Sequence, residues 1–296
     1  MTTNPTTLTP PSIDQMPTGY HRRRMINRIL LYSGMSLIGL IIVVPLLWMF
    51  STSFKPKPQL FSKEIYWIPK TITLENYQKI LDNPSTPIAK WFANSVFVAV
   101  VHTGVVLAIS TAAAYAYARL EFPGRKLLFA LLLVTLFLPG VMFLVPNFTT
   151  ITRMKLLDSF AGVLLPGFAA VFPVFFMRQF FESIPKELEE AAQIDGATTL
   201  QTFFKIVLPL SKPAIATLAI IEFLGSWNDF LWPILVLKNS QMLTLQPGLR
   251  TLQGAYTSEY GLMMAGAVIV AVPVLVLYIF LQRYIVQSVA TTGLKG

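Results

Sequence analysis

Six long apolar runs dominate the sequence and leave few ways in which the chain can fold. They cover residues 29–54, 91–118, 127–152, 159–177, 214–237 and 261–282. Within them, only His102, Glu222 and Asp229 belong to the acidic or basic residue types. A helix needs about 20 apolar residues to cross the hydrocarbon core of a bilayer, and each run reaches or approaches that length. The sequence therefore predicts an all-α membrane protein with six transmembrane helices.

The composition supports a membrane protein and excludes several kinds of chemistry. Hydrophobic residues make up 54% of the chain and charged residues 12%, whereas soluble domains carry about 25% charged residues. The absence of cysteine excludes disulfides, thiolate metal sites and thiol catalysis, and two histidines offer little for metal binding. No G-x-x-x-x-G-K-[ST] stretch occurs, so we expect no ATP site, no cofactor and no enzymatic activity in this chain.

Basic residues set the expected orientation. Four arginines, Arg22, Arg23, Arg24 and Arg28, come just before the first run, and basic flanks of a first span favour the cytoplasmic side. An even number of spans then places both termini in the cytoplasm. We therefore attribute the net charge of +9 to membrane orientation and expect no nucleic-acid partner. Residues 1–20, rich in Thr and Pro, are predicted to be a disordered tail before a transmembrane domain at 21–296.

The segment between the fourth and fifth runs predicts two short helices outside the membrane. Ser183 is a candidate cap for the first helix, and Gly196 suits its C-terminal end. Thr198 and Gln201 have the spacing of a capping box for a second helix. An ordinary amphipathic loop would explain these features equally well.

A motif in this segment favours a more specific interpretation. Glu190, Ala191 and Ala192 are followed at fixed spacing by Gly196 and then by Ile206, Leu208 and Pro209. This spacing resembles the EAA signature of permease subunits of ABC importers, EAA–x3–G–x9–I–x–LP. The resemblance implies the binding-protein-dependent permease fold and a cytoplasmic coupling region at about 182–212. In that family the first helix of this region docks on an ATPase subunit, so the seven motif residues are candidate ATPase-coupling residues.

Two further stretches resemble the carbohydrate branch of this family, and in particular the smaller permease subunit of maltose-type importers. Residues 225–233 read GSWNDFLWP, and the chain ends on Gly293, Leu294, Lys295 and Gly296, similar to a Gly-x-Lys-Gly tail. The resemblance implies that Gly293, Lys295 and Gly296 lie near the ATPase interface. It also implies that residues 252–256 face the solute receptor, although this loop departs from the maltose-type sequence.

The fifth run contains the candidate residues for a transport pathway. Glu222, Ser226 and Asp229 would share one face of a continuous helix, and carboxylates within a membrane usually face water or a partner. The full set of candidates is Glu222, Ser226, Trp227, Asn228, Asp229 and Trp232. A purely structural role for either carboxylate is about equally plausible, and the sugar contacts of the family can lie wholly in the second permease. We expect His102 to form a packing hydrogen bond.

Prolines within the runs predict kinks or breaks in the spans, which would serve either as hinges or only for packing. They are Pro139, Pro146, Pro166, Pro173, Pro233 and Pro273.

Together these patterns predict a permease subunit of an ATP-driven, binding-protein-dependent ABC importer for a sugar or oligosaccharide, in the inner membrane of a bacterial cell. The resemblance implies four kinds of partner: a second homologous permease, two ATPase subunits that bind ATP and Mg, an extracytoplasmic solute-binding protein and membrane lipid. One alternative is an ABC permease for another solute such as glycerol phosphate. Another is a stand-alone, ion-coupled secondary transporter with Glu222 and Asp229 as ion sites, but this leaves the 190–209 motif without a role.

Overall fold

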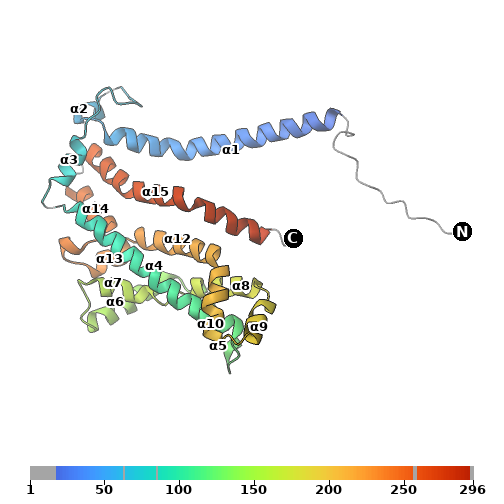
Figure 1. Cartoon of the computed structure of the whole chain (residues 1–296). Coiled ribbons are helices and arrows are strands. Elements are labelled where there is room, and N and C mark those ends of the chain that lie inside the picture. The colour runs from blue at the N-terminus through green and yellow to red at the C-terminus, as the bar shows by residue number, and fades with distance from the viewer. Residues whose placement is uncertain (1–17, 63, 85, 256–258, 294–296) are drawn as a thin grey trace.

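The computed structural model describes residues 18–62, 64–84, 86–255 and 259–293, and every regular element in these ranges is a helix. Three helices are long, apolar and continuous: α1 (Thr18–Ser53), α4 (Ile88–Arg119) and α15 (Tyr260–Gly293). Figure 1 shows α1 and α15 side by side, with α4 crossing the molecule beneath them. The predicted all-α fold is therefore confirmed.

Three further spans are each broken into two helical pieces that meet at an angle. Residues Arg125–Phe137 and Gly140–Arg153 meet at 99°, Phe160–Gly167 and Val171–Ser183 at 46°, and Thr199–Leu210 and Lys212–Trp227 at 76°. The chain therefore has three helices that are long and apolar enough to cross a membrane, or six spans if each bent pair counts as one. This number agrees with the six predicted spans, although the third bent pair begins with residues 199–210, which the sequence analysis places outside the membrane.

The broken spans comprise several short elements. The first contains α5 (Arg125–Val134), η2 (Thr135–Phe137), η3 (Gly140–Phe143) and α6 (Leu144–Arg153), and the second contains α7 (Phe160–Leu164), η4 (Leu165–Gly167) and α8 (Val171–Ser183). The third contains α10 (Thr199–Thr202), η5 (Phe203–Val207), α11 (Leu208–Leu210) and α12 (Lys212–Trp227). A separate short helix, α9 (Glu187–Ile194), links the second to the third.

The prolines within the runs occupy two kinds of position. Pro139 lies at the 99° break and Pro166 is in η4, just before the 46° break, as expected of residues that cannot donate a helical hydrogen bond. Pro146, Pro173 and Pro233 are each the third residue of a helix, where the backbone N–H would have no intrahelical partner. Pro273, in contrast, lies inside the continuous helix α15.

The fifth predicted span differs from the expected continuous helix over 214–237. Helix α12 ends at Trp227, and α13 (Leu231–Val236) begins only after a short connection. The chain then continues through η6 (Ser240–Met242) and α14 (Leu245–Ala255) to α15. Asp229 therefore lies beyond the end of α12 and does not share its face with Glu222 and Ser226.

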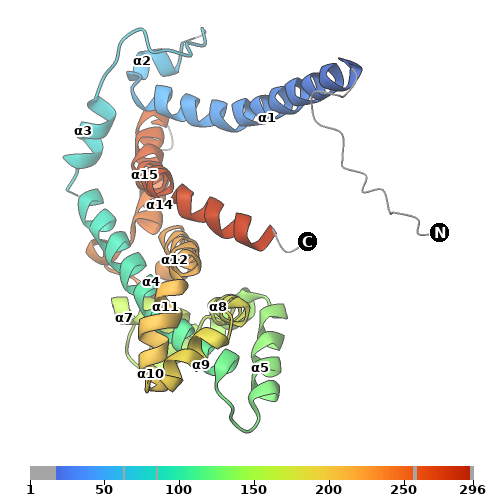
Figure 2. The same cartoon turned by 45° about the vertical axis from the view of Figure 1, so that its right-hand side comes forward.

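Helix α4 lies at the centre of the packing. It packs most extensively against α8 and α12, and it contributes residues to both hydrophobic cores. One core includes Trp91, Val98, Trp227, Val236 and Leu245, and the other includes Tyr115, Met177, Phe181, Val207 and Leu218. Figures 1 and 2 agree that α9, α10 and the end of α4 lie together at one end of the molecule, whereas α2 (Lys57–Leu60) and α3 (Glu75–Leu81) lie at the other.

Helix α1 has a very different environment from α4. No residue in its most apolar stretch is buried within the chain, whereas a third of the corresponding stretch of α4 is buried. Helix α1 therefore presents apolar side chains for lipid or for another chain. The tail predicted for 1–20 lies mostly outside the described residues, and α1 already begins at Thr18.

Candidate functional site

The motif between the fourth and fifth spans folds as a helix, a glycine turn and a second helix. Gly196 has a φ of 83°, which L side chains rarely adopt. Its N–H donates to the carbonyl of Gln193 at 3.0 Å, and the N–H of Ala197 donates to that of Ala192 at 2.9 Å. These two bonds form a Schellman motif, so the predicted C-terminal cap of α9 is confirmed.

The second helix begins with the predicted capping box. The N–H of Gln201 donates to Oγ1 of Thr198 at 3.3 Å, and the N–H of Thr198 donates to Oε1 of Gln201 at 2.9 Å. The proposed cap at Ser183 is wrong, because Ser183 is the last residue of α8 and its hydroxyl donates to the carbonyl of Phe180 at 2.7 Å. Helix α9 begins at Glu187 without a side-chain cap.

The last part of the motif lies where the chain bends toward α12. Residues 203–207 form a π-helical turn, and Ser211 follows at the 76° bend. The Ser211 hydroxyl is buried and donates to the carbonyl of Val207 at 2.7 Å. Of the motif residues here, Ile206 and Leu208 are half-buried and Pro209 is exposed. These three residues thus belong to the bend rather than to α9.

Helix α9 has a buried face and an exposed face. Glu189 and Ala192 are buried, whereas Glu190 and Ala191 are exposed. Ile194, at the end of α9, is 87% exposed. Large apolar side chains are also exposed on the helical segments that follow, namely Leu200, Phe204 and Leu210. We call residues 187–210 the coupling unit, and we call its exposed residues Glu190, Ala191, Ile194, Leu200, Phe204 and Leu210 the outer face of this unit.

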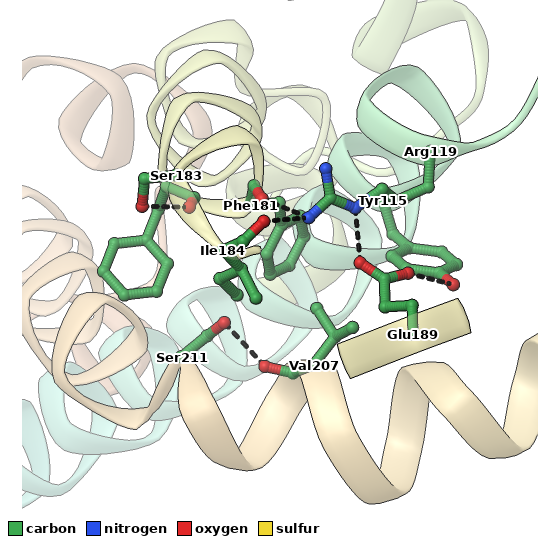
Figure 3. Close-up of polar contacts among 9 residues, drawn as sticks. Tyr115, Arg119, Phe181, Ser183, Ile184, Glu189, Val207 and Ser211 are labelled. Atoms are coloured by element: carbon green, nitrogen blue, oxygen red, sulfur yellow. Dashed lines mark hydrogen bonds and ion pairs between the residues drawn. The ribbon is translucent and has the colours of Figure 1, made fainter. Parts of the chain in front are cut away.

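A buried charge cluster holds α9 against α4 and α8 (Figure 3). Nε of Arg119 lies 2.5 Å from Oε1 of Glu189, and both side chains are 7% exposed. The other end of the guanidinium donates to the carbonyls of Phe181 at 2.7 Å and Ile184 at 2.8 Å. Tyr115, one turn earlier on α4, donates to Oε2 of Glu189 at 3.2 Å. We call Tyr115, Arg119 and Glu189 the Arg119 clamp.

The Arg119 clamp was missed by the sequence analysis. Arg119 directly follows the second apolar run, and its position there was a usable signal of a functional cation. Glu189 gave no such signal. Glu187, Glu189 and Glu190 lie close together in the sequence, and only the burial of Glu189 in the folded chain distinguishes it from the other two. The Phe181 and Ile184 carbonyls are at the C-terminal end of α8, where the last backbone acceptors have no i+4 partner within the helix, and the Phe181 carbonyl also accepts from the N–H of Ile184 at 3.1 Å.

The pathway candidates of the fifth span fall into four environments. Oε2 of Glu222 lies 3.4 Å from Nε2 of His102, so His102 makes the packing contact that we expected. Ser226, Asp229 and Trp232 line one cavity of about 390 Å³, together with His102 and Asn147.

The other two candidates face elsewhere. Trp227 is buried between Phe92 and Phe223. Asn228 lines a second cavity of about 510 Å³ and accepts a 3.3 Å hydrogen bond from Gln246. The six candidates therefore do not form one continuous stripe.

Two of these cavity-lining residues also make contacts at the start of α13. Oδ1 of Asp229 lies 3.4 Å from the N–H of Trp232, near the start of α13. The indole N–H of Trp232 donates to the carbonyls of Gly162 and Val163 at 3.2 and 3.1 Å. Trp232 therefore fastens α13 to α7. Of the tail candidates, Gly293 ends α15, and Lys295 and Gly296 lie outside the described residues.

Comparisons with known proteins agree with this architecture. The family described as the binding-protein-dependent transport system inner membrane component matches residues 104–291. The arabinooligosaccharides transport system permease protein AraQ of Halalkalibacterium halodurans is 39% identical, and the match covers 90% of this chain and 96% of AraQ. The diacetylchitobiose uptake system permease protein NgcG of Streptomyces coelicolor is 36% identical, with coverage of 85% and 84%.

A solved structure shows the same fold. A bacterial ABC transporter that imports the acidic polysaccharide alginate contains a chain that matches with a TM-score of 0.78 and 26% identity. The match covers 91% of this chain and 98% of that chain. With its apolar spans, its motif at 190–209 and these relatives, the chain belongs to the binding-protein-dependent permease family, whose members are inner-membrane subunits of ABC importers.

Proposed function

We propose that this chain is the permease subunit of an ABC importer for a neutral or acidic saccharide, and that it couples one half of the translocation pathway to a separate ATPase. The observation that carries this proposal is the two-faced coupling unit. Its inner side is fixed to α4 and α8 by the Arg119 clamp, while its outer face leaves Glu190 and several apolar side chains exposed and without a side-chain partner among the described residues.

The outer face has the chemistry of a docking surface for another protein. Exposed Ile194, Leu200 and Phe204 would bury apolar area in a complex, which is the main favourable term in association. Glu190 would form a charge-assisted pair with a cation of the ATPase, and the small side chain of Ala191 would allow close approach. A stand-alone transporter would have no use for such a surface.

The saccharide class is supported by the relatives. AraQ and NgcG are described as permeases for arabinooligosaccharides and diacetylchitobiose, and the solved structure belongs to an alginate importer. These names cover both neutral and acidic sugars, so they support a saccharide without fixing its charge. The family relation also supports a second permease, two ATPase subunits and an extracytoplasmic binding protein as partners.

We infer that α9 lies in the cytoplasm, together with both termini. Arg23 and Arg28 before the first span support this orientation, because basic flanks favour the cytoplasmic side. The chain has no native cysteine, so single cysteines test it directly. A cysteine at exposed Ser62 should react with an impermeant thiol reagent in intact cells, and a cysteine at exposed Thr199 should not. The reverse labelling pattern would overturn the orientation.

Purification of the tagged chain from its native membranes tests the coupling role. We expect an ATPase and a second permease to co-purify, and Glu190→Lys to lose the ATPase because it places a cation against a cation. Glu187→Lys is the matched control, since Glu187 is exposed on the same helix outside the motif. Recovery of the ATPase with Glu190→Lys at the wild-type level would contradict the docking role of the outer face.

A further inference from the structure

Helix α4 is held by polar contacts at both of its ends, and these contacts lie far apart. The Arg119 clamp is at its last turns. At its first turns, the indole N–H of Trp91 donates to the carbonyl of Ser240 at 2.7 Å. The distance along the helix from Trp91 to Arg119 is about 42 Å at 1.5 Å per residue. The two ends of α4 therefore contact elements on opposite sides of the membrane-spanning part.

The contacts at the first turns form a second clamp around residues 240–245. Nδ2 of Asn94 donates to the carbonyls of Gln241 at 3.0 Å and Leu243 at 2.9 Å. The hydroxyl of Ser95 accepts from the N–H of Leu245 at 2.8 Å. All three side chains are buried, with Trp91 at 0%, Asn94 at 8% and Ser95 at 3% exposed. We call Trp91, Asn94 and Ser95 the Asn94 clamp.

Close packing adds to the Asn94 clamp. Gly248, in the second turn of α14, approaches the ring of Trp91 so closely that a Cβ there would lie within 2.8 Å of Cζ3. Residues 240–245 lead directly into α14, so the clamp fixes the start of that helix as well as the connection before it.

Between the clamps, α4 is a single helix without a proline or a break. The third, fourth and fifth spans are bent by 99°, 46° and 76°, and such bends can absorb a displacement. A continuous helix packed on both sides instead moves as one body, because packed interiors deform little. Of the described spans, α4 is thus the one that joins α9 to the opposite end of the molecule without a bend.

The polar contacts of the Arg119 clamp are better suited to fixing the position of α9 against α4 and α8 than to raising the stability of the chain. A buried ion pair is weak evidence for stability, since well-packed apolar residues often replace it without loss. It does, however, define one geometry, because the guanidinium fork must meet the Glu189 carboxylate and the α8 carbonyls together. Glu189 lies on the inner side of α9, so a shift of the outer face is passed to α4 through this carboxylate.

We propose that α4 is a rigid connector that carries movement of α9 to residues 240–245 at the opposite end of the helix. The Arg119 clamp and the Asn94 clamp are its positioning residues. This inference rests on the proposed function, because it takes the ATPase to be what moves α9. It adds a route through this chain by which ATP binding on one side of the membrane changes the surface on the other side.

A thiol reporter tests the connector in the complete complex. Ser240→Cys changes one atom of an exposed side chain whose backbone carbonyl accepts the bond from Trp91. In the complex purified from native membranes, ATP with vanadate should change the labelling rate of this cysteine about five- to tenfold, a usual size for coupling between sites. Adding Glu189→Gln should reduce the change to less than about twofold while ATP hydrolysis persists.

Two further variants keep the test sharp. Tyr115→Phe removes one hydroxyl from the Arg119 clamp and should weaken the response even if Glu189→Gln does not assemble. Ser110→Ala is the matched control, because Ser110 is buried within α4 between the two clamps and its hydroxyl has no hydrogen-bond partner in the part of the chain that the structure describes. It should keep the full response.

The outcomes separate the connector from the proposed function. If the reporter does not respond in an otherwise wild-type complex that hydrolyses ATP, or if it still responds fully in a Glu189→Gln or Tyr115→Phe complex that hydrolyses ATP, the connector is wrong and the permease assignment stands. If no ATPase co-purifies with the wild-type chain, the proposed function itself fails.

Discussion

Glu189 and Glu190 are neighbours on α9, yet the side chain of Glu189 is 7% exposed and that of Glu190 lies at the surface. Successive residues on a helix point about 100° apart, so the two carboxylates face different surroundings. Both oxygens of Glu189 are occupied, by Arg119 and Tyr115. The same residue type thus fixes the fold on one face of α9, as Glu189, and stays at the surface on the other face, as Glu190.

The difference between the faces is mainly one of solvation. A charge removed from water is costly unless it is paired, so the inner face depends strongly on each of its partners. A charge that stays in water contributes little to the stability of its own chain. Substitutions on the inner face should therefore change the stability of the chain, and substitutions on the outer face should change only its assembly.

The largest effect is expected from Glu189→Ala. This change leaves the Arg119 guanidinium buried without its carboxylate, and breaking a buried pair from one side costs about 3–5 kcal/mol. The measurement is the thermal unfolding of the purified chain in detergent. The double variant Glu189→Leu with Arg119→Met should recover much of the loss, because apolar residues can fill the site without a charge. A single variant as stable as wild type would remove the distinction between the faces.

A smaller effect is expected from Gly196→Val, which changes the turn that joins the two helices of the coupling unit. The φ of 83° costs an L residue about 1–2 kcal/mol. A Cβ at Gly196 would meet no atom within 4 Å, so the cost comes from the backbone alone. Gly196→Asn should therefore be much better tolerated than Gly196→Val, since Asn adopts positive φ more readily. Equal stability of the two variants would contradict this explanation.

The features of the coupling unit that could be predicted from the sequence are local ones. Gly196 and the Thr198 capping box depend on residues three to five positions apart, and both were predicted correctly. The Arg119 clamp joins residues 70 positions apart, so it depends on how α4 meets α9 in the folded chain. No local pattern contains that information.

In the fifth span, the sequence analysis predicted a continuous helix that the structure does not contain. Hydropathy alone predicted one helix across 214–237, because the apolar run has no gap. The helix ends at Trp227. After it, the indole N–H of Trp232 donates to the backbone of α7, and Oδ1 of Asp229 approaches the N–H of Trp232 in the first turn of α13. These hydrogen bonds hold α13 in its position after the break, and a hydropathy pattern does not record them. The cavity beside Asp229 was likewise beyond a prediction from helical periodicity.

A loss of about 1 kcal/mol is expected from Thr198→Ala. The hydroxyl accepts from the N–H of Gln201, and removal of such a cap typically costs about this amount. Thr199→Ala is the matched control, because Thr199 is an exposed residue in the first turn of α10 and caps nothing. Thermal unfolding of both variants checks the prediction, and a Thr199→Ala loss as large as that of Thr198→Ala would show that the cap is not responsible.

The smallest effect on stability, and the most specific effect on assembly, is expected from Glu190→Gln. An exposed side chain without a partner in its own chain can be replaced with a change within about 0.5 kcal/mol. If Glu190 pairs with a cation of the ATPase, the amide loses the charge and keeps the shape, so the amount of ATPase recovered with the chain should fall. Glu189→Gln should do the reverse, with a lower unfolding temperature and an intact outer face. Comparing both variants in one experiment sharpens the contrast between the faces. The unfolding temperature should fall in Glu189→Gln, and the recovery of the ATPase should fall in Glu190→Gln. A Glu190→Gln variant that unfolds early and still binds the ATPase would reverse the assignment of the two faces.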